Sequence, residues 1–303
     1  MTTRLYFVHA LSPLHAGTGQ GSGVIDLPIA REKATGIPYL PGSSVKGVLR
    51  DKAGENELTY ALFGPPTANA SDHAGSLQLA DARLLLLPVR SLRGTFAWVT
   101  SPYLLRRIAR DAADAGVHTS LTVPTLADGE CDVIAQSALK LDRQQVNAKV
   151  MIEDLDLTAK PQQAQAWADW LKGKLFPSSD TVWPTLLAER LCIVSDDVFS
   201  FLLTTAIEVI ARNRLEDTTK TVAKGALWYE EALPAETVLY GLATITPSKQ
   251  ALIHYRDRNN DKDFKIEELV SKLNEIASGS MQFGGKATVG RGLCRVHLLE
   301  GGK

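Results

Sequence analysis

The sequence has 303 residues, enough for one large domain or two smaller ones, and 45% of them are hydrophobic and 22% charged, as in an ordinary globular protein. Its net charge of -1 excludes a uniformly basic nucleic-acid-binding protein, so any contact with RNA or DNA has to use a local basic patch.

The cysteines and the apolar segments indicate a cytoplasmic protein. Cys131, Cys192 and Cys294 form no C-x-x-C pair, which is typical of a reducing compartment and excludes a cysteine-based zinc site. No basic region followed by a long apolar core precedes the first strand, so we expect no signal peptide. The longest apolar stretch, residues 198–211, is interrupted by Glu208 and by hydroxyl residues, and no membrane contact is predicted.

The first predicted strand, residues 4–12, leads into a glycine-rich loop. Pro13 ends the strand, because proline cannot donate a hydrogen bond to a sheet. Glycines follow at alternate positions and would let a ligand approach the backbone closely: Gly17, Gly19, Gly21 and Gly23. The spacing is G-x-G-x-G and the next residues, 24–31, are predicted to be extended, whereas a dinucleotide-binding loop needs G-x-G-x-x-G and opens a helix. We therefore reject a dinucleotide site.

Asp26 interrupts an otherwise apolar run, residues 24–29. A carboxylate in such a position is either a loop residue that faces solvent or a functional group. His15, across the same loop, could share a site with Asp26, although an isolated histidine also has structural uses.

Residues 41–50 predict a short amphipathic helix. Ser43 or Ser44 can cap its start, and Lys46 and Arg50 are one turn apart on one face. A helix N-terminus with two hydroxyls and a lysine is suited to binding phosphate, and an ordinary capped helix explains the residues equally well.

The next elements begin a ferredoxin-like βαββαβ unit. After a polar loop, residues 77–89 predict a strand that is buried on both faces, and residues 94–100 predict its partner strand. Ser101 and Pro102 start a helix. Residues 117–190 are interpreted as an insertion without an assigned role. It contains short strands at 132–135 and 148–155 and a helix at 163–174.

A long arm is predicted between residues 211 and 245. Ser195 caps a helix that extends to about residue 213, and two strands, 225–231 and 237–245, follow as a hairpin joined around residues 233–236. The charged lead-in to this hairpin is poorly suited to a protein core, and projecting arms of this kind usually contact a partner.

Residues 257–268 resemble a calcium-binding loop, but Lys262 stands where that loop requires glycine, so we prefer a solvated turn before a helix at 264–278. The last motif is a second glycine-rich loop, residues 281–292, with Gly284, Gly285, Lys286 and Arg291. Exposed amides and two cations suit a phosphate backbone.

Six segments together resemble the RAMP superfamily of CRISPR–Cas proteins, and most closely the backbone subunit of type III effector complexes, in particular of the type III-B (Cmr) form. They are LxPLHAGTG from residue 11, IDLPIARE from 25, YLPGSSVKGVLRD from 39, LFG from 62, the NRLEDTTKTVAKGALWYEEALPAETVLY arm from 213 and FGGKATVGRG from 283.

The resemblance implies an α+β fold: a single RAMP domain over residues 1–303 with a modified ferredoxin-like (RRM-like) core. It has an inserted helical region at about 117–190 and a thumb hairpin at about 211–245. Copies of the protein would stack with other type III subunits along a CRISPR RNA, and the thumb would enter the duplex of guide and target RNA. The guide backbone would be held by residues of the first helix and of the second glycine-rich loop, namely Ser43, Ser44, Lys46, Arg50, Gly284, Gly285, Lys286 and Arg291.

The resemblance also implies that Asp26 is the catalytic residue of a metal-dependent endoribonuclease that cuts target RNA at regular intervals. Asp26 would position Mg²⁺, or else Mn²⁺, or accept the 2′-hydroxyl proton itself. His15, Tyr229, Glu230 and Glu231 would help to orient the scissile bond. The alternative is a guide-RNA-binding scaffold subunit of the same complex without cleavage. The arm argues against an enzyme that processes precursor CRISPR RNA, since such relatives typically lack a thumb of this kind. No motif of a small-molecule enzyme is present.

Overall fold

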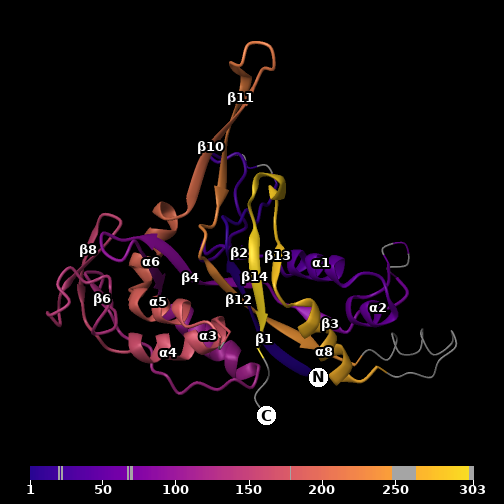
Figure 1. The fold of residues 1–303 in the computed structure, drawn as a ribbon, viewed down its shortest axis with the longest axis horizontal. Helices are drawn as coiled ribbons and strands as arrows, with labels where there is room; N and C mark the ends of the chain where they lie inside the picture. The colour runs from indigo at the N-terminus through magenta and orange to yellow at the C-terminus, as the bar shows by residue number, and fades with distance from the viewer. Residues whose placement is uncertain are drawn as a thin grey trace.

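A mixed β-sheet forms the centre of the computed structural model, which describes residues 1–19, 21, 23–66, 68, 71–177, 179–247 and 264–299 (Figure 1). Its twelve strands include ten in the order β13-β14-β1-β12-β4-β5-β9-β6-β8-β7, with β2 paired to β4 and β3 paired to β12. Their bounds are β1 Thr2–Ala10, β2 Tyr39–Leu40, β3 Leu77–Leu79, β4 Ala82–Arg90, β5 Phe96–Thr100, β6 Glu130–Asp132, β7 Lys149–Ile152, β8 Leu155–Ala159, β9 Leu191–Val194, β12 Val238–Ile245, β13 Ser280–Gln282 and β14 Leu293–Leu298.

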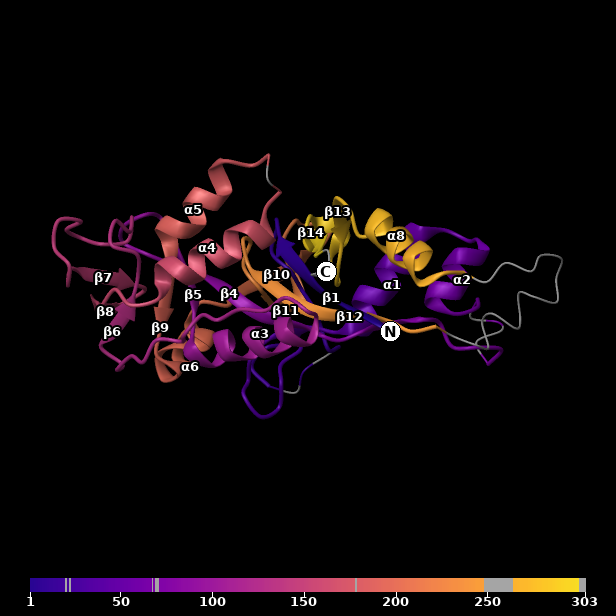
Figure 2. The same cartoon turned by 90° about the horizontal axis from the view of Figure 1, so that it is seen from below.

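Seven α-helices of the described residues pack around this sheet. They are α1 Gly42–Ala53, α2 Glu57–Phe63, α3 Pro102–Asp114, α4 Ala164–Leu175, α5 Val182–Arg190, α6 Asp196–Thr205 and α8 Ile266–Ile276. Helices α1, α2 and α8 gather at one end of the molecule, and α3 to α6 lie towards the other (Figure 2). The predicted helix at 264–278 corresponds to α8, whereas most of the calcium-like loop, residues 257–263, lies outside the described residues.

The central strand β1 is buried on both faces. Alternate side chains of a strand point to opposite faces, and those of Leu5 and Phe7 enter the core that contains α3, α4 and α5. Tyr6 and Val8 enter the second core, which contains α1, α2 and α8. This double burial explains the continuous apolar run from residue 5 to residue 8.

The strand order corrects the predicted ferredoxin-like assignment for residues 94–100. Strand β5 pairs with β4 as expected, but it lies on the side of β4 away from β1. The strand between β1 and β4 is β12, antiparallel to both. The predicted strand 77–89 is also interrupted, because β3 ends at Leu79 and β4 begins at Ala82. The insertion 117–190 adds to the same sheet: β6, β7 and β8 continue it beyond β9, and the predicted helix at 163–174 is α4.

The pairing predicted for the arm is wrong. The helix after Ser195 ends at Thr205, and the next residues form strand β10, Glu208–Leu215. Strand β11, Val222–Ala232, pairs with β10 rather than with β12, and these two strands project from the body of the molecule as a separate hairpin (Figure 1). Strand β12 carries buried residues on both faces, so it belongs to the central sheet. Residues 233–236 connect the hairpin to that sheet. No helix among the described residues has the length and apolarity of a membrane span.

Candidate functional site

The loop that carries Asp26 pairs with the base of the projecting hairpin. Leu27 forms a parallel bridge with Glu230: the amide of Leu27 donates to the carbonyl of Tyr229 (3.1 Å), and the amide of Glu231 donates to the carbonyl of Leu27 (3.0 Å). The loop therefore extends the hairpin by a short third strand. In Figure 1 the loop after β1 lies at the foot of β10 and β11, beside the loop between β13 and β14.

Asp26 is exposed, and one hydrogen bond with a described residue orients its side chain. The backbone amide of Tyr229 donates to Oδ2 of Asp26 at 2.8 Å, and Oδ1 has no hydrogen bond with a described residue. One carboxylate oxygen is thus oriented by the hairpin while the other faces outward. Such an oxygen can accept a proton or coordinate a cation.

Glu231 clamps the same loop, and its side chain is buried. Its Oε2 accepts a hydrogen bond from the amide of Ile29 at 2.9 Å, and its Oε1 forms an ion pair with Arg31. Arg31 also donates to the carbonyl of Gly36 (3.0 Å). Glu231 faces the protein, so the structure gives it a positioning contact rather than direct access to a ligand.

His15 is 6% exposed and joins three segments. Its Nδ1 donates to the carbonyl of Glu231 at 2.7 Å, since a carbonyl can only accept, and its own carbonyl accepts from the amide of Gly285 at 3.0 Å. Gly284 has φ +71°, and a Cβ there would lie 2.3 Å from the carbonyl oxygen of His15, so only glycine fits. His15 therefore ties both glycine-rich loops to the hairpin.

Glu230 is 1% exposed and pairs with Lys286 of the second glycine-rich loop. Its Oε1 accepts from Nζ of Lys286 (2.9 Å) and from Nε1 of Trp228 (2.7 Å). Burial raises the pKa of Glu230, but the hydrogen bonds from Lys286 and Trp228 and the charges of Lys286 and Arg212 outweigh burial, so the net pKa is lowered. The carboxylate is consequently ionised at neutral pH.

These segments enclose a hollow of about 430 Å³. It is lined by Gly21, Asp26, Leu27, Gly225, Leu227, Trp228 and Lys286. The hollow brings Asp26 and Lys286 together from opposite ends of the chain, although the resemblance implies guide binding for Lys286. Arg291 of the same loop is buried, and its charge opposes the rise in pKa that burial causes at Glu208. Its guanidinium therefore faces the protein rather than a surface groove.

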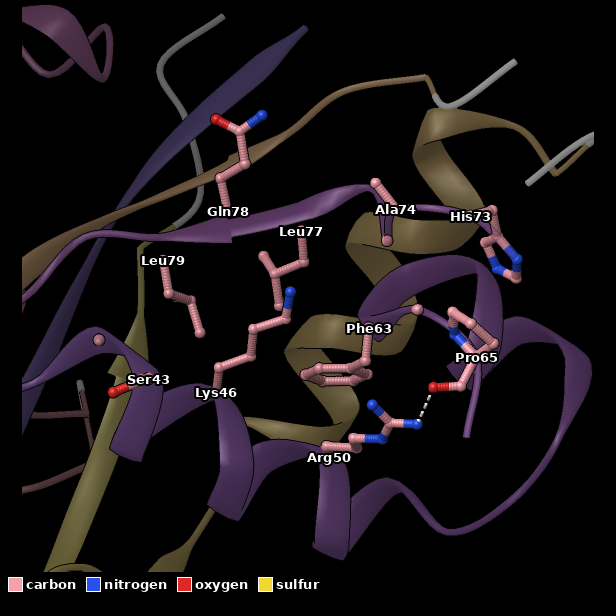
Figure 3. A pocket seen from close by; sticks show the side chains of 13 residues that line it. Ser43, Lys46, Arg50, Phe63, Pro65, His73, Ala74, Leu77, Gln78 and Leu79 are labelled. Carbon is pink, nitrogen blue, oxygen red and sulfur yellow. Dashed lines mark hydrogen bonds between the residues drawn. The ribbon is translucent and has the colours of Figure 1, made fainter. Parts of the chain in front are cut away.

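Helix α1 lines a second hollow of about 590 Å³ (Figure 3). Ser43, Lys46 and Arg50 face it, and Arg50 donates to the carbonyl of Pro65. Burial lowers the pKa of Lys46, and the charge of Arg50 lowers it further. Two neighbouring cations with partly removed solvent suit an anion such as a backbone phosphate.

The predicted cap of α1 is wrong. The helix follows Pro41, and neither Ser43 nor Ser44 caps it with a side-chain hydrogen bond. Instead the amide of Gly42 donates to Oδ1 of Asp81 at 2.8 Å, from the turn between β3 and β4. A Cβ on Gly42 would lie 2.5 Å from the carbonyl oxygen of Leu79, so this close approach requires glycine. The sequence signal for this contact was Asp81, a carboxylate that stands between two apolar strands.

An exposed apolar face on the hairpin was also missed by the sequence reasoning. Tyr229 lies opposite Ala211, and Leu227 lies opposite Asn213, so their side chains share the face that Val209 begins. Leu227 is 58% exposed and Tyr229 is 41% exposed. Alternation of apolar residues at 227 and 229 was the available signal in the sequence.

The hollow that contains Asp26 and Lys286 offers a metal ion one carboxylate oxygen, Oδ1 of Asp26. No cluster of three or more His, Cys, Asp or Glu side chains among the described residues could hold a metal ion. Mg²⁺ is commonly bound through one or two carboxylates together with substrate phosphates and waters. Asp26 fits an ion of that kind, which a bound phosphate would complete.

Comparison with known proteins gives one family. The model of the RAMP superfamily matches residues 7–295. The chain is 36% identical over 311 residues to "CRISPR system Cmr endoribonuclease Cmr4" of Pyrococcus furiosus, covering 99% of this chain and 97% of that protein. The crystal structure of oligomeric Cmr4 from Pyrococcus furiosus has a TM-score of 0.72 at 28% identity and covers 99% of this chain and 98% of its own. A chain of the type III-B Cmr-beta complex bound to cognate target RNA shares the fold, with a TM-score of 0.66 at 17% identity, and covers 98% of this chain and 97% of its own.

Proposed function

The chain belongs to the RAMP superfamily, and on that premise we propose that it is a backbone subunit of a type III-B effector filament that binds CRISPR RNA and cleaves complementary target RNA. The name of the Pyrococcus furiosus relative, an endoribonuclease, supports cleavage, and the oligomeric crystal structure supports stacking of copies. The observation that carries the proposal is the position of Asp26, outward-facing at the base of the projecting hairpin.

The core is proposed to be a modified ferredoxin-like, or RRM-like, unit. The strand order β14-β1-β12-β4 supports this, with each neighbouring pair antiparallel. Helix α1 lies in the chain between β1 and β4, and α8 lies between β12 and β14. This order fits a βαββαβ arrangement with a large insertion between its second and third strands.

The β10–β11 hairpin is proposed to be the thumb that enters the duplex of guide and target. The exposed side chains of Val209, Leu227 and Tyr229 support this, because apolar wedges separate stacked bases at a modest energetic cost. Target RNA whose bases are separated beside the hairpin would have its phosphate backbone at the hollow that contains Asp26.

The guide is proposed to lie against helix α1 and the second glycine-rich loop. Lys46 and Arg50 would neutralise backbone phosphates, with the hydroxyls of Ser43 and Ser44 and the amide of Gly284 as further donors. The amide of Gly285 is already bonded to the carbonyl of His15, so Gly285 would contribute only close approach of the backbone. Arg291, which is buried, would support the loop from inside. Stacked copies would join these local patches into a continuous groove, which reconciles RNA binding with a net charge of -1. Other effector subunits would close the ends of the filament, which we place in the cytoplasm.

Cleavage is proposed to use the ribose 2′-hydroxyl of the target. Its oxygen forms a bond to the adjacent phosphorus while the bond from phosphorus to the 5′-oxygen breaks. The 2′-hydroxyl proton passes to Asp26 or to solvent, and the departing 5′-oxygen takes a proton from water, leaving a 2′,3′-cyclic phosphate and a 5′-hydroxyl end. Tyr229 would orient Asp26 through its amide, and Glu231 and His15 would hold the loop.

A divalent cation, Mg²⁺ or Mn²⁺, is proposed as the cofactor, with Asp26 as its protein ligand. When bound, it would polarise the phosphate and offset the negative charge of the reaction.

The test is cleavage of target RNA by the reconstituted guide-loaded complex, wild type against Asp26→Asn, with Mg²⁺ or with EDTA. Regularly spaced cuts that disappear with Asp26→Asn while target binding persists would support the proposal, and their loss in EDTA would support the metal. Tight binding without cuts in the wild type would instead make the chain a scaffold subunit. Cuts that survive Asp26→Asn would remove Asp26 from the mechanism.

A further inference from the structure

We propose that Lys286 is a second catalytic residue, whose ammonium group binds a non-bridging oxygen of the scissile phosphate beside Asp26. The inference rests on the proposed target-RNA cleavage and changes the role that the resemblance implies for Lys286, from holding the guide to acting on the target.

The first support is the composition of the hollow at the hairpin base. Lys286 is the only cationic side chain among the described residues that line it, and Asp26 is the only acidic one. A phosphate entering this hollow would therefore meet one cation, which comes from the second glycine-rich loop. Helix α1, which carries Lys46 and Arg50, lines a different hollow.

The second support is the way in which Lys286 is held. Glu230 is 1% exposed, and a carboxylate that is removed from water needs a cation close by. Its Oε1 accepts from Nζ of Lys286 (2.9 Å) and is itself oriented by Nε1 of Trp228 (2.7 Å). Its Oε2 is buried and has no hydrogen-bond partner among the described residues, so Lys286 is the main compensation for this charge.

Lys286 also keeps capacity for a ligand. An ammonium group has three donors, and the bond to Glu230 uses one of them. The side chain is 32% exposed, so the remaining donors can reach a phosphate from the hollow. A lysine fixed in this way loses little freedom when the substrate arrives.

The backbone places Lys286 and Asp26 relative to each other before RNA binds. The amide of Gly285, directly before Lys286, donates to the carbonyl of His15 (3.0 Å). The ring of His15 is bonded to the carbonyl of Glu231, whose side chain in turn holds the amide of Ile29 in the loop of Asp26. The two residues are therefore attached to one hydrogen-bonded junction.

This arrangement suits the charge that develops during cleavage. As the 2′-oxygen adds to phosphorus, negative charge accumulates on the non-bridging oxygens. A preorganised ammonium group at those oxygens lowers the barrier because it needs no rearrangement at that moment. Lys286 keeps its proton throughout, so the transfers of the 2′ and 5′ protons are unchanged.

The experiment compares Lys286→Met with Lys149→Met in the complete guide-loaded complex. Lys149 lies on β7 at the far edge of the sheet, forms an exposed ion pair with Asp156 of β8, and serves as the matched control. With target RNA bound at saturation, Lys286→Met should slow cleavage in a single turnover by about a hundredfold or more. Guide content and target affinity should stay close to those of the control.

Two further variants separate catalysis from folding. Lys286→Met leaves Glu230 buried without its cation, so the double variant Lys286→Met with Glu230→Gln removes that charge and should be as slow as the single variant. Lys286 already has φ +68°, and methionine adds no backbone strain there. Lys286→Arg keeps the charge and should cut at least about tenfold faster than Lys286→Met.

Three results would overturn the inference. If both methionine variants cut at the wild-type rate while Asp26→Asn does not cut, the inference alone fails. A second overturning result is that Lys286→Met loses guide RNA while bound target is cut normally. The slope of log guide affinity against log salt concentration would then be shallower by about 0.7, and Lys286 would serve the guide. If the wild-type complex cuts no target, the proposed function fails and the inference fails with it.

Discussion

Replacing Glu231 with alanine should loosen the loop that carries Asp26. The carboxylate of Glu231 is the acceptor for the buried amide of Ile29 and the ion-pair partner of Arg31. A buried amide without an acceptor costs about 1–3 kcal/mol. The side chain of Arg31 is 29% exposed and can be rehydrated, so the loss of its ion pair adds only about 1 kcal/mol. Together we expect the free energy of unfolding to fall by about 2–4 kcal/mol.

Thermal unfolding measures this change. A chain of this length shifts its Tm by roughly 2 °C per kcal/mol, so Glu231→Ala should unfold about 4–8 °C below the wild type. Glu231→Gln keeps an acceptor for Ile29 and should lose less than half as much. The control is Asp169→Ala, which breaks an exposed ion pair with Lys172 on α4 and should cost no more than about 0.5 kcal/mol.

The result that would refute this reasoning is a Tm for Glu231→Ala equal to that of Asp169→Ala. It would mean that the loop is held by its backbone pairing with β11 and that the carboxylate contributes nothing measurable. Hydrogen exchange at the amide of Ile29 would then also be unchanged, whereas the clamp predicts faster exchange in the alanine variant.

Three other variants test separate contacts. The pKa of Glu230 is lowered in the folded protein, so the stabilisation by this carboxylate is present above the unfolded pKa and is lost as pH falls through the folded pKa. Glu230→Gln should therefore lose less stability than the wild type below about pH 4.5. Chemical denaturation at several pH values measures this, and an unchanged acid profile would contradict it. Gly284→Ala should destabilise the protein by more than about 2 kcal/mol because its Cβ meets the carbonyl of His15 at 2.3 Å, whereas Gly279→Ala, with open space and φ +80°, should cost about 1 kcal/mol, and equal melting temperatures would exclude the steric reason. Leu227→Ser on the exposed hairpin face should leave stability within about 0.5 kcal/mol and slow target cleavage by about tenfold, and an unaffected rate would argue against a wedge at this position.

Much of the fold was accessible from local patterns. The apolar run of β1, the Ser-Pro start of α3 and the amphipathic pattern of α4 each contain their own signal within one element. The pairing of the hairpin was not accessible in this way. Of the three segments that form strands, 208–215, 225–231 and 237–245, the first was interpreted as the end of a helix, so the other two were paired with each other. Which two of them pair depends on β12 being inserted between β1 and β4, a contact between distant segments.

The same limit applies to the candidate site. Asp26, His15, Glu230, Glu231 and Lys286 were all selected from the sequence, and the structure places them around one junction. Asp26, His15 and Lys286 stood out in local patterns, but Glu230, Glu231 and the catalytic roles depended on the resemblance, since an aspartate in an apolar run does not reveal its neighbours. Residues whose roles arise from long-range contacts were missed: Arg31 meets its partner 200 positions away in the sequence, and Asp81 caps a helix that begins 39 positions earlier.

The most direct test of the central claim is a structure of the complete complex trapped with intact target RNA by Asp26→Asn. We predict a target phosphate in the hollow at the base of the hairpin, within about 4 Å of residue 26, at each position where the wild type cuts. A scissile phosphate outside that hollow, beyond the reach of residue 26, would contradict the assignment of this site to cleavage.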